Sequence, residues 1–155
     1  MRLALFEPDI PQNAGALIRL AACMEVGLDI IGPCGFVLSD RDVKRVSLDY
    51  SEYSAVKEYE SWQNFIETIE TYENKVRIVL LTTKSTMSYV KFSFKRNDII
   101  LLGRESAGVP KYIHEVVKNK ITIPMNSKVR SMNVANAAAM VLSEAMRQTD
   151  LLPKK

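Results

Sequence analysis

The sequence predicts a single α/β domain in which a parallel sheet is sandwiched between helices on both faces. The chain of 155 residues has the length of one compact domain, so we expect a single domain over residues 1–155. Apolar segments of strand length alternate along the chain with segments whose apolar residues recur at helical spacing. Two of the strand-like segments are apolar throughout, which is typical of strands buried on both faces of a parallel sheet.

The strand-like segments predict a five-stranded sheet. Arg2–Glu7 is a short apolar run, and Leu28–Ile31 is a second one that a Gly-Pro pair closes. Val76–Leu81 and Asp98–Leu102 are the two uninterrupted apolar runs. Lys120–Ile123 is a further strand, and a proline ends it.

Four helices are predicted between and after these strands. Pro11–Val26 carries apolar residues three or four positions apart, and Ser61–Glu73 places its apolar side chains on one helical face. Val109–Lys118 is opened by Pro110, a residue that suits the first turn of a helix. Asn133–Gln148 is long, and residues that favour the N-cap position stand at its start.

The composition argues against several classes of protein. The chain has no run of about 18 apolar residues that could span a membrane, and its N-terminal stretch turns acidic too soon for a secretory signal. We therefore expect a cytoplasmic protein with reduced thiols, of which Cys23 lies in an apolar helical pattern and is expected to be buried. Two cysteines and the single His114 are too few ligands for a zinc site, so no metal is expected. No nucleophile motif stands near His114, which disfavours a histidine-dependent hydrolase.

Charge is distributed unevenly along the chain. Residues 1–77 hold 8 basic and 13 acidic side chains, whereas residues 78–155 hold 13 basic and 5 acidic ones. Such an asymmetry is typical of a protein with one face that meets a polyanion. Solvated surface lysines are the alternative interpretation, and charge alone does not decide between them.

The position of a ligand site follows from the predicted topology. In a parallel α/β sheet, ligands bind beyond the carboxyl ends of the strands. Polar residues and glycines interrupt the apolar pattern at four such places, namely Glu7–Gly15, Leu81–Lys84, Gly103–Pro110 and Pro124–Asn133.

The first of these segments has features of an anion site. Asn13 is a residue type that favours the N-cap, and the free amides of a helix start attract negative charge. Gly15 allows a backbone to approach closely, and Arg19 lies one turn further along the helix, where its guanidinium could bind a phosphate. An ordinary capped helix with a surface arginine is the alternative.

The second segment connects a buried strand to a helix through two glycines, Gly103 and Gly108. It has neither the Lys-Ser/Thr ending of a Walker loop nor the glycine spacing of a Rossmann loop, which disfavours a dinucleotide oxidoreductase. A strand-to-helix turn that needs glycine for its backbone explains the glycines. It does not explain the adjacent charges of Arg104 and Glu105.

The third segment leads into a helix with little side-chain bulk. Asn133 and Asn136 share a face at its start, and the alanines that follow them allow another backbone to come very close. This arrangement suits hydrogen bonding to a small ligand or to a neighbouring stretch of chain.

In sequence, the three segments read N-x-G-x-x-x-R, then L-G-x-E-x-x-G-V-P, then I-P-M…R-S-M-N…N-A. In this order and spacing they resemble motifs one to three of the SPOUT methyltransferases. The likeness is strongest to the short tRNA (cytidine/uridine-34 2′-O)-methyltransferase family, and it covers essentially the whole chain, including the stretches LDYSEY and LLTTK. One departure is Arg104, where the family usually has a different residue.

The resemblance implies a fold and a cofactor. It implies that the C-terminal segment is threaded into a deep trefoil knot, which would explain the small residues of the second and third segments. It also implies that S-adenosyl-L-methionine binds in the knot and leaves as S-adenosyl-L-homocysteine. By the match of motifs, the groups that hold this cofactor belong to Leu81, Gly103, Ile123, Ser131 and Met132.

The same resemblance implies a reaction and its residues. The family methylates the ribose 2′-hydroxyl of the wobble nucleotide of tRNA, and it usually works as a homodimer. By the match of motifs, Arg19 would position the nucleotide while the RNA phosphate shares the role of base, because an arginine hardly ever deprotonates. Asn13 and Asn133 would orient the ribose and Arg19, and Ser131 would line the methyl-transfer pocket.

Two other functions remain open at this point. A related enzyme could methylate a 2′-hydroxyl elsewhere on tRNA or on rRNA, although such relatives often carry an additional RNA-binding domain. A non-catalytic RNA-binding module of the same fold is the other alternative. Binding of S-adenosylmethionine would separate it from an enzyme.

Overall fold

The computed structural model describes residues 1–37 and 55–154 of the chain. Over these residues the strands are β1 (Arg2–Phe6), β2 (Gly27–Ile31), β3 (Val56–Tyr59), β4 (Arg77–Leu81), β5 (Asp98–Leu102) and β6 (Asn119–Ile121). The helices are α1 (Pro11–Cys23), α3 (Trp62–Glu70), the 3-10 helix η2 (Tyr89–Lys91), α4 (Lys111–Val116) and α5 (Val134–Thr149). The strands form one sheet in the order β3-β2-β1-β5-β4-β6, and every neighbouring pair is parallel.

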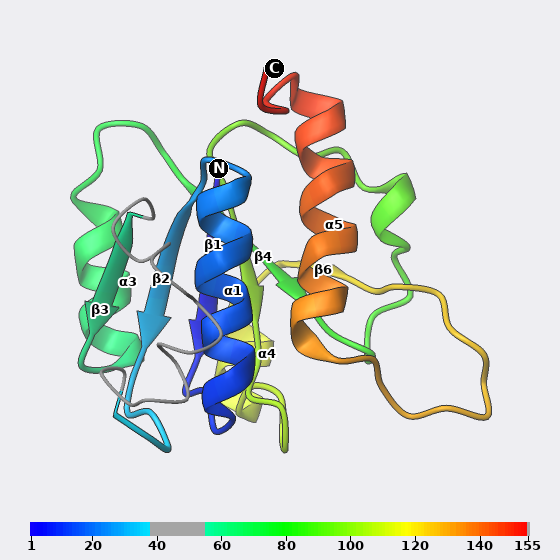
Figure 1. The fold of residues 1–155 in the computed structure, drawn as a ribbon, viewed down its shortest axis with the longest axis horizontal. Coiled ribbons are helices and arrows are strands. Elements are labelled where there is room, and N and C mark those ends of the chain that lie inside the picture. The colour runs from blue at the N-terminus through cyan, green and yellow to red at the C-terminus, as the bar shows by residue number, and fades with distance from the viewer. Residues whose placement is uncertain (38–54, 155) are drawn as a thin grey trace.

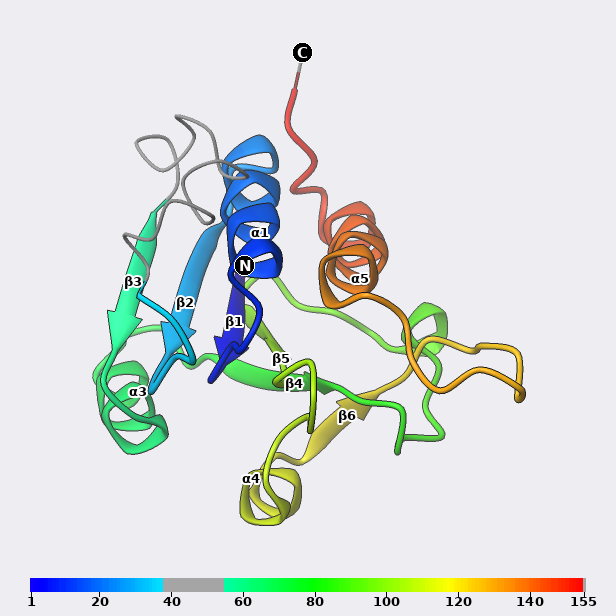
Figure 2. The same ribbon diagram turned by 60° about the horizontal axis from the view of Figure 1, so that its bottom comes forward.

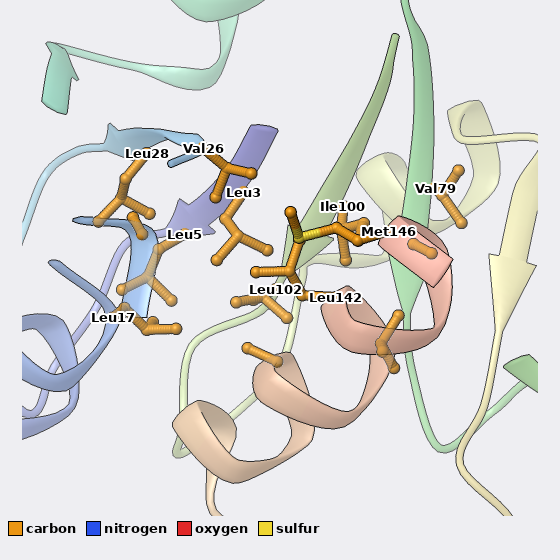
Figure 3. Close-up of a cluster of buried hydrophobic side chains, with 14 of the residues drawn as sticks. Leu3, Leu5, Leu17, Val26, Leu28, Val79, Ile100, Leu102, Leu142 and Met146 are labelled. Atoms are coloured by element: carbon orange, nitrogen blue, oxygen red, sulfur yellow. The ribbon is translucent and has the colours of Figure 1, made fainter. Parts of the chain in front are cut away.

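Helices cover both faces of this sheet, as the sequence predicts. α1 and α5 lie side by side on one face, and α3 and α4 cover the other (Figure 1 and Figure 2). Because successive residues of a strand point to opposite faces, β1 contributes to two cores. Leu3 and Leu5 pack toward α1 and α5 in the cluster of Figure 3, whereas Ala4 and Phe6 pack toward α3 and α4.

The prediction of five strands is wrong, because the described residues contain a sixth, β3. This strand reads Val-Lys-Glu-Tyr and lies at the edge of the sheet, where Lys57 and Glu58 are exposed and only Tyr59 is buried. Charged side chains are common on edge strands, where they discourage pairing with other chains. The apolar pattern that identifies the central strands is therefore absent from it.

The prediction that Cys23 is buried is also wrong, because its side chain is exposed at the end of α1. The buried face of α1 includes Leu17, Ile18 and Ala21. Each residue turns a helix by 100°, so Cys23 points roughly 200° away from Ala21. Its place within an apolar segment does not put it on the apolar face.

Two buried carboxylates lie on neighbouring parts of the sheet, each held by an arginine. Arg2 donates from Nε and Nη2 to the two carboxylate oxygens of Asp29, at 2.7 and 2.6 Å. Arg77 binds Asp98 in the same bidentate way, at 2.8 and 2.7 Å. Both carboxylates are fully buried. Their pairing with a guanidinium compensates for the cost of removing a charge from water.

Gly27 makes room for the first of these pairs. A Cβ at this position would lie 2.0 Å from Nη1 of Arg2, too close for any side chain while the arginine stays in place.

Within residues 1–37 and 55–154, none of the helices is both long enough and apolar enough to cross a membrane. The LDYSEY stretch, residues 48–53, lies outside the described residues.

Candidate active site

A cavity of about 580 Å³ lies beyond the carboxyl ends of the central strands, a volume within the usual range for small-molecule sites. Its walls come from the residues that follow β4, β5 and β6, from the start of α1 and from the start of α5. All four segments that the sequence predicts as ligand-binding contribute to it. The cavity therefore lies at the edge of the sheet where ligand sites of parallel α/β proteins are expected.

The structure brings nearly all of the predicted site residues together. The cavity is lined by Asn13, Leu81, Gly103, Ile123, Ser131, Met132 and Asn133. Arg19 does not line it. This arginine is exposed on α1, about a turn and a half beyond Asn13.

Asn13 does not cap α1, contrary to the prediction from its residue type. The helix begins at Pro11 with Ile10 in the capping position, because proline suits the first helical residue. Asn13 is therefore within the first turn, where its side chain is largely buried. Its Nδ2 donates to Oε1 of Glu105 at 3.0 Å, and its Oδ1 accepts from Nδ2 of Asn133 at 2.9 Å.

Asn133 caps α5, as its residue type predicts. Its Oδ1 accepts the backbone N–H groups of Ala135 and Asn136, at 3.0 and 3.2 Å. Since the oxygen is used by the cap, the amide nitrogen points toward Asn13. One side chain therefore ties the beginning of α5 to the beginning of α1.

Glu105 joins this network from the loop that follows β5. Its Oε1 accepts from Asn13, and its Oε2 accepts the backbone N–H of Asp9 at 3.1 Å. Burial and the neighbouring carboxyl of Asp9 raise the pKa of Glu105. The sequence alone assigns no role to Glu105 and none to Asp9. No local sequence pattern could have linked these two residues, because they are 96 positions apart.

The β5–α4 loop, residues 103–110, turns back on itself next to the network. Arg104 and Gly108 exchange two backbone hydrogen bonds, at 3.1 and 2.7 Å. Gly108 has a φ of 71°, and a Cβ on Gly103 would lie 2.6 Å from the carbonyl carbon of Gly108. Both glycines are therefore required by the turn.

Arg104, the departure from the family pattern, fixes this loop to the end of β1. Its Nε donates to the backbone oxygen of Glu7 at 3.1 Å, and its guanidinium forms an ion pair with the Glu7 carboxylate. Arg104 therefore has a structural partner in Glu7, directly after β1.

The lining of the cavity suits a ligand that has an apolar part and that binds next to a negatively charged group, such as a phosphate. Leucine and isoleucine side chains at the strand ends form the apolar part of the wall. The charged side chains that line it are mainly basic: Lys84, Arg104 and Arg130, compared with the acidic Glu105. In the part of the chain that the structure describes, no three His, Cys, Asp or Glu side chains cluster as a metal site would require.

A solved structure described as giving structural insights into the 2-OH methylation of C/U34 on tRNA has the same fold. Its TM-score is 0.89 at 34% identity, and the match covers 95% of this chain and 94% of that one. The SpoU methyltransferase AviRb of Streptomyces viridochromogenes, in complex with the cofactor AdoMet, matches with a TM-score of 0.86 over 96% of this chain and 60% of its own. At 24% identity this second likeness shows the fold alone.

Sequence comparison extends the likeness to nearly the whole chain. The chain is 47% identical over 153 residues to a tRNA (cytidine(34)-2′-O)-methyltransferase of Beijerinckia indica, a match that covers 98% of this chain and 94% of that protein. A sequence model of the SpoU rRNA Methylase family matches residues 1–143. These findings confirm the resemblance carried by the three motifs, and the chain belongs to the SpoU rRNA methylase family.

Proposed function

We propose that this protein transfers the methyl group of S-adenosylmethionine to the ribose 2′-hydroxyl of the wobble nucleotide, cytidine or uridine 34, of tRNA. The observation that carries the proposal is the match to a tRNA (cytidine(34)-2′-O)-methyltransferase, 47% identical over 98% of the chain. The cavity at the carboxyl end of the sheet, bordered by Asn13, Glu105 and Asn133, provides the site.

The size and the lining of the cavity support binding of this cofactor. Leu81 and Ile123 offer apolar side chains and backbone groups, which suit an adenine ring held by main-chain hydrogen bonds. At Gly103 the absence of a side chain leaves backbone as the wall. Ser131 and Met132 line the cavity from the segment before α5. When bound there, S-adenosylmethionine supplies an electrophilic methyl group, and S-adenosylhomocysteine is the product.

The chain's own residues position the nucleotide and assist its hydroxyl. A ribose hydroxyl is a weak nucleophile, so its proton must be withdrawn as the new bond forms. Arg19 binds the substrate phosphate, which serves as the proton acceptor, since a guanidinium keeps its protons. Exposure of Arg19 on α1 supports contact with a large substrate rather than with the enclosed cofactor.

Asn13 and Asn133 act mainly by holding the site in shape. Their amides are bonded to each other, and each also bonds to a further group, Glu105 in one case and the start of α5 in the other. A side chain used in this way orients its neighbours and leaves little hydrogen-bonding capacity for the ribose. Ser131 is exposed on the wall of the cavity, which supports its assignment to the methyl-transfer pocket.

The proposal extends to the assembly. We place the protein in the cytoplasm as a homodimer whose C-terminal segment is threaded into a trefoil knot. Adjacent packing of α1 and α5 on one face of the sheet, with Met140 partly exposed, supports that face as the dimer contact. Light scattering of the purified protein tests the dimer, and a monomer mass would contradict it.

A methyl-transfer assay tests the proposed reaction. Purified protein is incubated with S-adenosylmethionine labelled in its methyl group and with a tRNA transcript whose nucleotide 34 is cytidine or uridine. We expect incorporation of label that is lost when nucleotide 34 carries a 2′-deoxyribose. Undiminished incorporation into the deoxy-substituted transcript would place the reaction at another nucleotide. No binding of S-adenosylmethionine in a calorimetric titration would instead indicate a non-catalytic module.

A further inference from the structure

Two carboxyl groups meet where α1 begins and the β5–α4 loop turns. Asp9 stands just before the first turn of α1, and Glu105 stands in the loop. The backbone N–H of Asp9 donates to Oε2 of Glu105 at 3.1 Å, and the two side chains lie within hydrogen-bonding reach of each other. Like charges at such a distance repel strongly, so a pair of ionised carboxylates is an unfavourable arrangement here.

The protein donors around this pair leave one oxygen without a partner. Ser106 Oγ donates to Oδ2 of Asp9, and Asn13 Nδ2 donates to Oε1 of Glu105. Oδ1 of Asp9 is buried, and no donor among the described residues reaches it. A buried acceptor without a hydrogen bond destabilises the fold, so its missing donor requires an explanation.

Among the residues that the structure describes, the other charged groups nearby do not supply this donor. The positive charge of Arg104 favours an ionised Asp9, but the Arg104 guanidinium is bonded to the backbone oxygen and the carboxylate of Glu7. From the segment that follows β2, the half-buried Cys34 thiol lies close enough to feel the charge of Glu7, and Gly35 packs against the backbone of Asp9. Within residues 1–37 and 55–154, a proton on one of the two carboxyl groups is the remaining source.

We propose that Asp9 and Glu105 share one proton, carried by Glu105 and donated to Asp9, and that this bond positions Asn13 by fixing the β5–α4 loop to the start of α1. Asp9 is then a positioning residue of the site, one that does not itself line the cavity. The hydrogen-bonded chain runs from Asp9 through Glu105 and Asn13 to Asn133, and so links the loop to both helix starts. The sharing of this proton is independent of which nucleotide the protein methylates.

The direction of both titrations agrees with this assignment. The hydrogen bond with Glu105 lowers the pKa of Asp9, while burial and then the bond with Asp9 raise the pKa of Glu105. A raised pKa means that Glu105 stabilises the fold fully at low pH, and that this contribution is lost as pH rises through the raised value. The contribution of Asp9 is lost as pH falls through its lowered value. The loop is therefore held best between the two values.

Ligand affinity as a function of pH tests the positioning role. Binding of S-adenosylmethionine to the full chain should weaken as pH rises through the titration of Glu105, because the loop loosens when the proton leaves. The change Asp9→Asn should remove this dependence, since the introduced amide donates to Glu105 without a shared proton. A direct attraction between ionised Glu105 and the cationic ligand would produce the opposite trend. Affinity that strengthens or stays constant over this range would contradict the positioning role.

A carboxyl titration followed by NMR tests the proton itself, without cofactor or tRNA, so a failed methylation assay leaves this result standing. In the unmodified chain, the side-chain carboxyl signal of Glu105 should titrate above the ordinary glutamate value of about 4.3, and that of Asp9 below about 3.9. Asp9→Asn should lower the pKa of Glu105, whereas the control Glu115→Gln, on the exposed side of α4, should change neither signal. If Glu105 titrates at its ordinary value in the unmodified chain, the two residues share no proton.

Discussion

At the scale of single residues, the fold depends on charges that lie where water does not reach. Asp29 and Asp98 are fully buried, and each has a bidentate arginine as its main partner. A buried ion pair adds little stability compared with an apolar pair, but removal of one partner leaves an uncompensated charge. The two arginines therefore matter more for the stability of the fold than their partly exposed position suggests.

Replacing Arg77 tests this dependence. Arg77→Ala leaves the buried carboxylate of Asp98 without its guanidinium and should lower the free energy of unfolding by about 3 kcal/mol. Urea denaturation measures the change. Arg147→Ala is the matched control, because its pair with Glu144 is exposed on α5 and should hardly affect the unfolding midpoint. Equal losses for the two variants would contradict the importance of burial.

Arg19 is the residue on which the proposed chemistry depends most. Because it is exposed and lies outside the cavity, Arg19→Ala should leave binding of S-adenosylmethionine intact. Loss of the group that positions the phosphate should reduce methylation by roughly 10²–10³-fold. Calorimetry with the cofactor and a single-turnover methylation assay measure the two effects. Normal turnover would remove Arg19 from the mechanism.

At the scale of elements, the structure shows which patterns of sequence can be read and which cannot. The apolar runs of β4 and β5 predict their strands because those strands are central, whereas the charged edge strand β3 resembles a loop. The four ligand-binding segments could be predicted because strand polarity alone places them at one edge of the sheet. Asn13 does not cap the helix because, with Pro11 as the first helical residue, α1 begins three residues earlier than an N-cap at Asn13 would place it.

Contacts between distant segments were beyond prediction from a single sequence. Asn13 and Asn133 are 120 positions apart, and Asp9 and Glu105 are 96 apart. The motifs indicate that such segments meet. They do not indicate which atom of one side chain bonds to which atom of another, because this depends on helix rotation and side-chain packing.

The start of α5 offers a test of how an element supports the site. Asn133→Ala removes a cap and should lower stability by about 1 kcal/mol. It also breaks the bond to Asn13, so affinity for S-adenosylmethionine should fall. Ser61→Ala removes the comparable cap of α3, on the other face of the sheet, and should lower stability without changing cofactor affinity. Thermal unfolding and calorimetry compare the variants. A similar loss of affinity in both would show that Asn133 has no special connection to the site.

At the scale of the whole molecule, the excess of basic residues in the second half of the chain suits a nucleic-acid partner. Lys84 and Arg130 line the cavity, and both are exposed. They come from segments on different elements, after β4 and before α5, and so converge on the site only in the folded chain.

The salt dependence of tRNA binding tests this surface. If about three phosphates are neutralised, affinity should fall roughly 40-fold between about 50 and 200 mM salt. Lys84→Ala combined with Arg130→Ala should make the slope shallower by about two ion equivalents. Lys111→Ala serves as a control, because this lysine pairs with Glu115 on α4. A flat salt response would exclude the basic residues as the contact with tRNA.

Mapping of ribose methylation by mass spectrometry tests the central claim most directly. Unmodified tRNA is incubated with S-adenosylmethionine, with and without the purified protein, and digested to fragments whose masses locate each added methyl group. We predict one new methyl group, on the ribose of nucleotide 34. A methyl group on the ribose of another nucleotide would contradict the proposed substrate position. A tRNA that gains no methyl group, although the protein binds S-adenosylmethionine, would contradict the proposed reaction on tRNA.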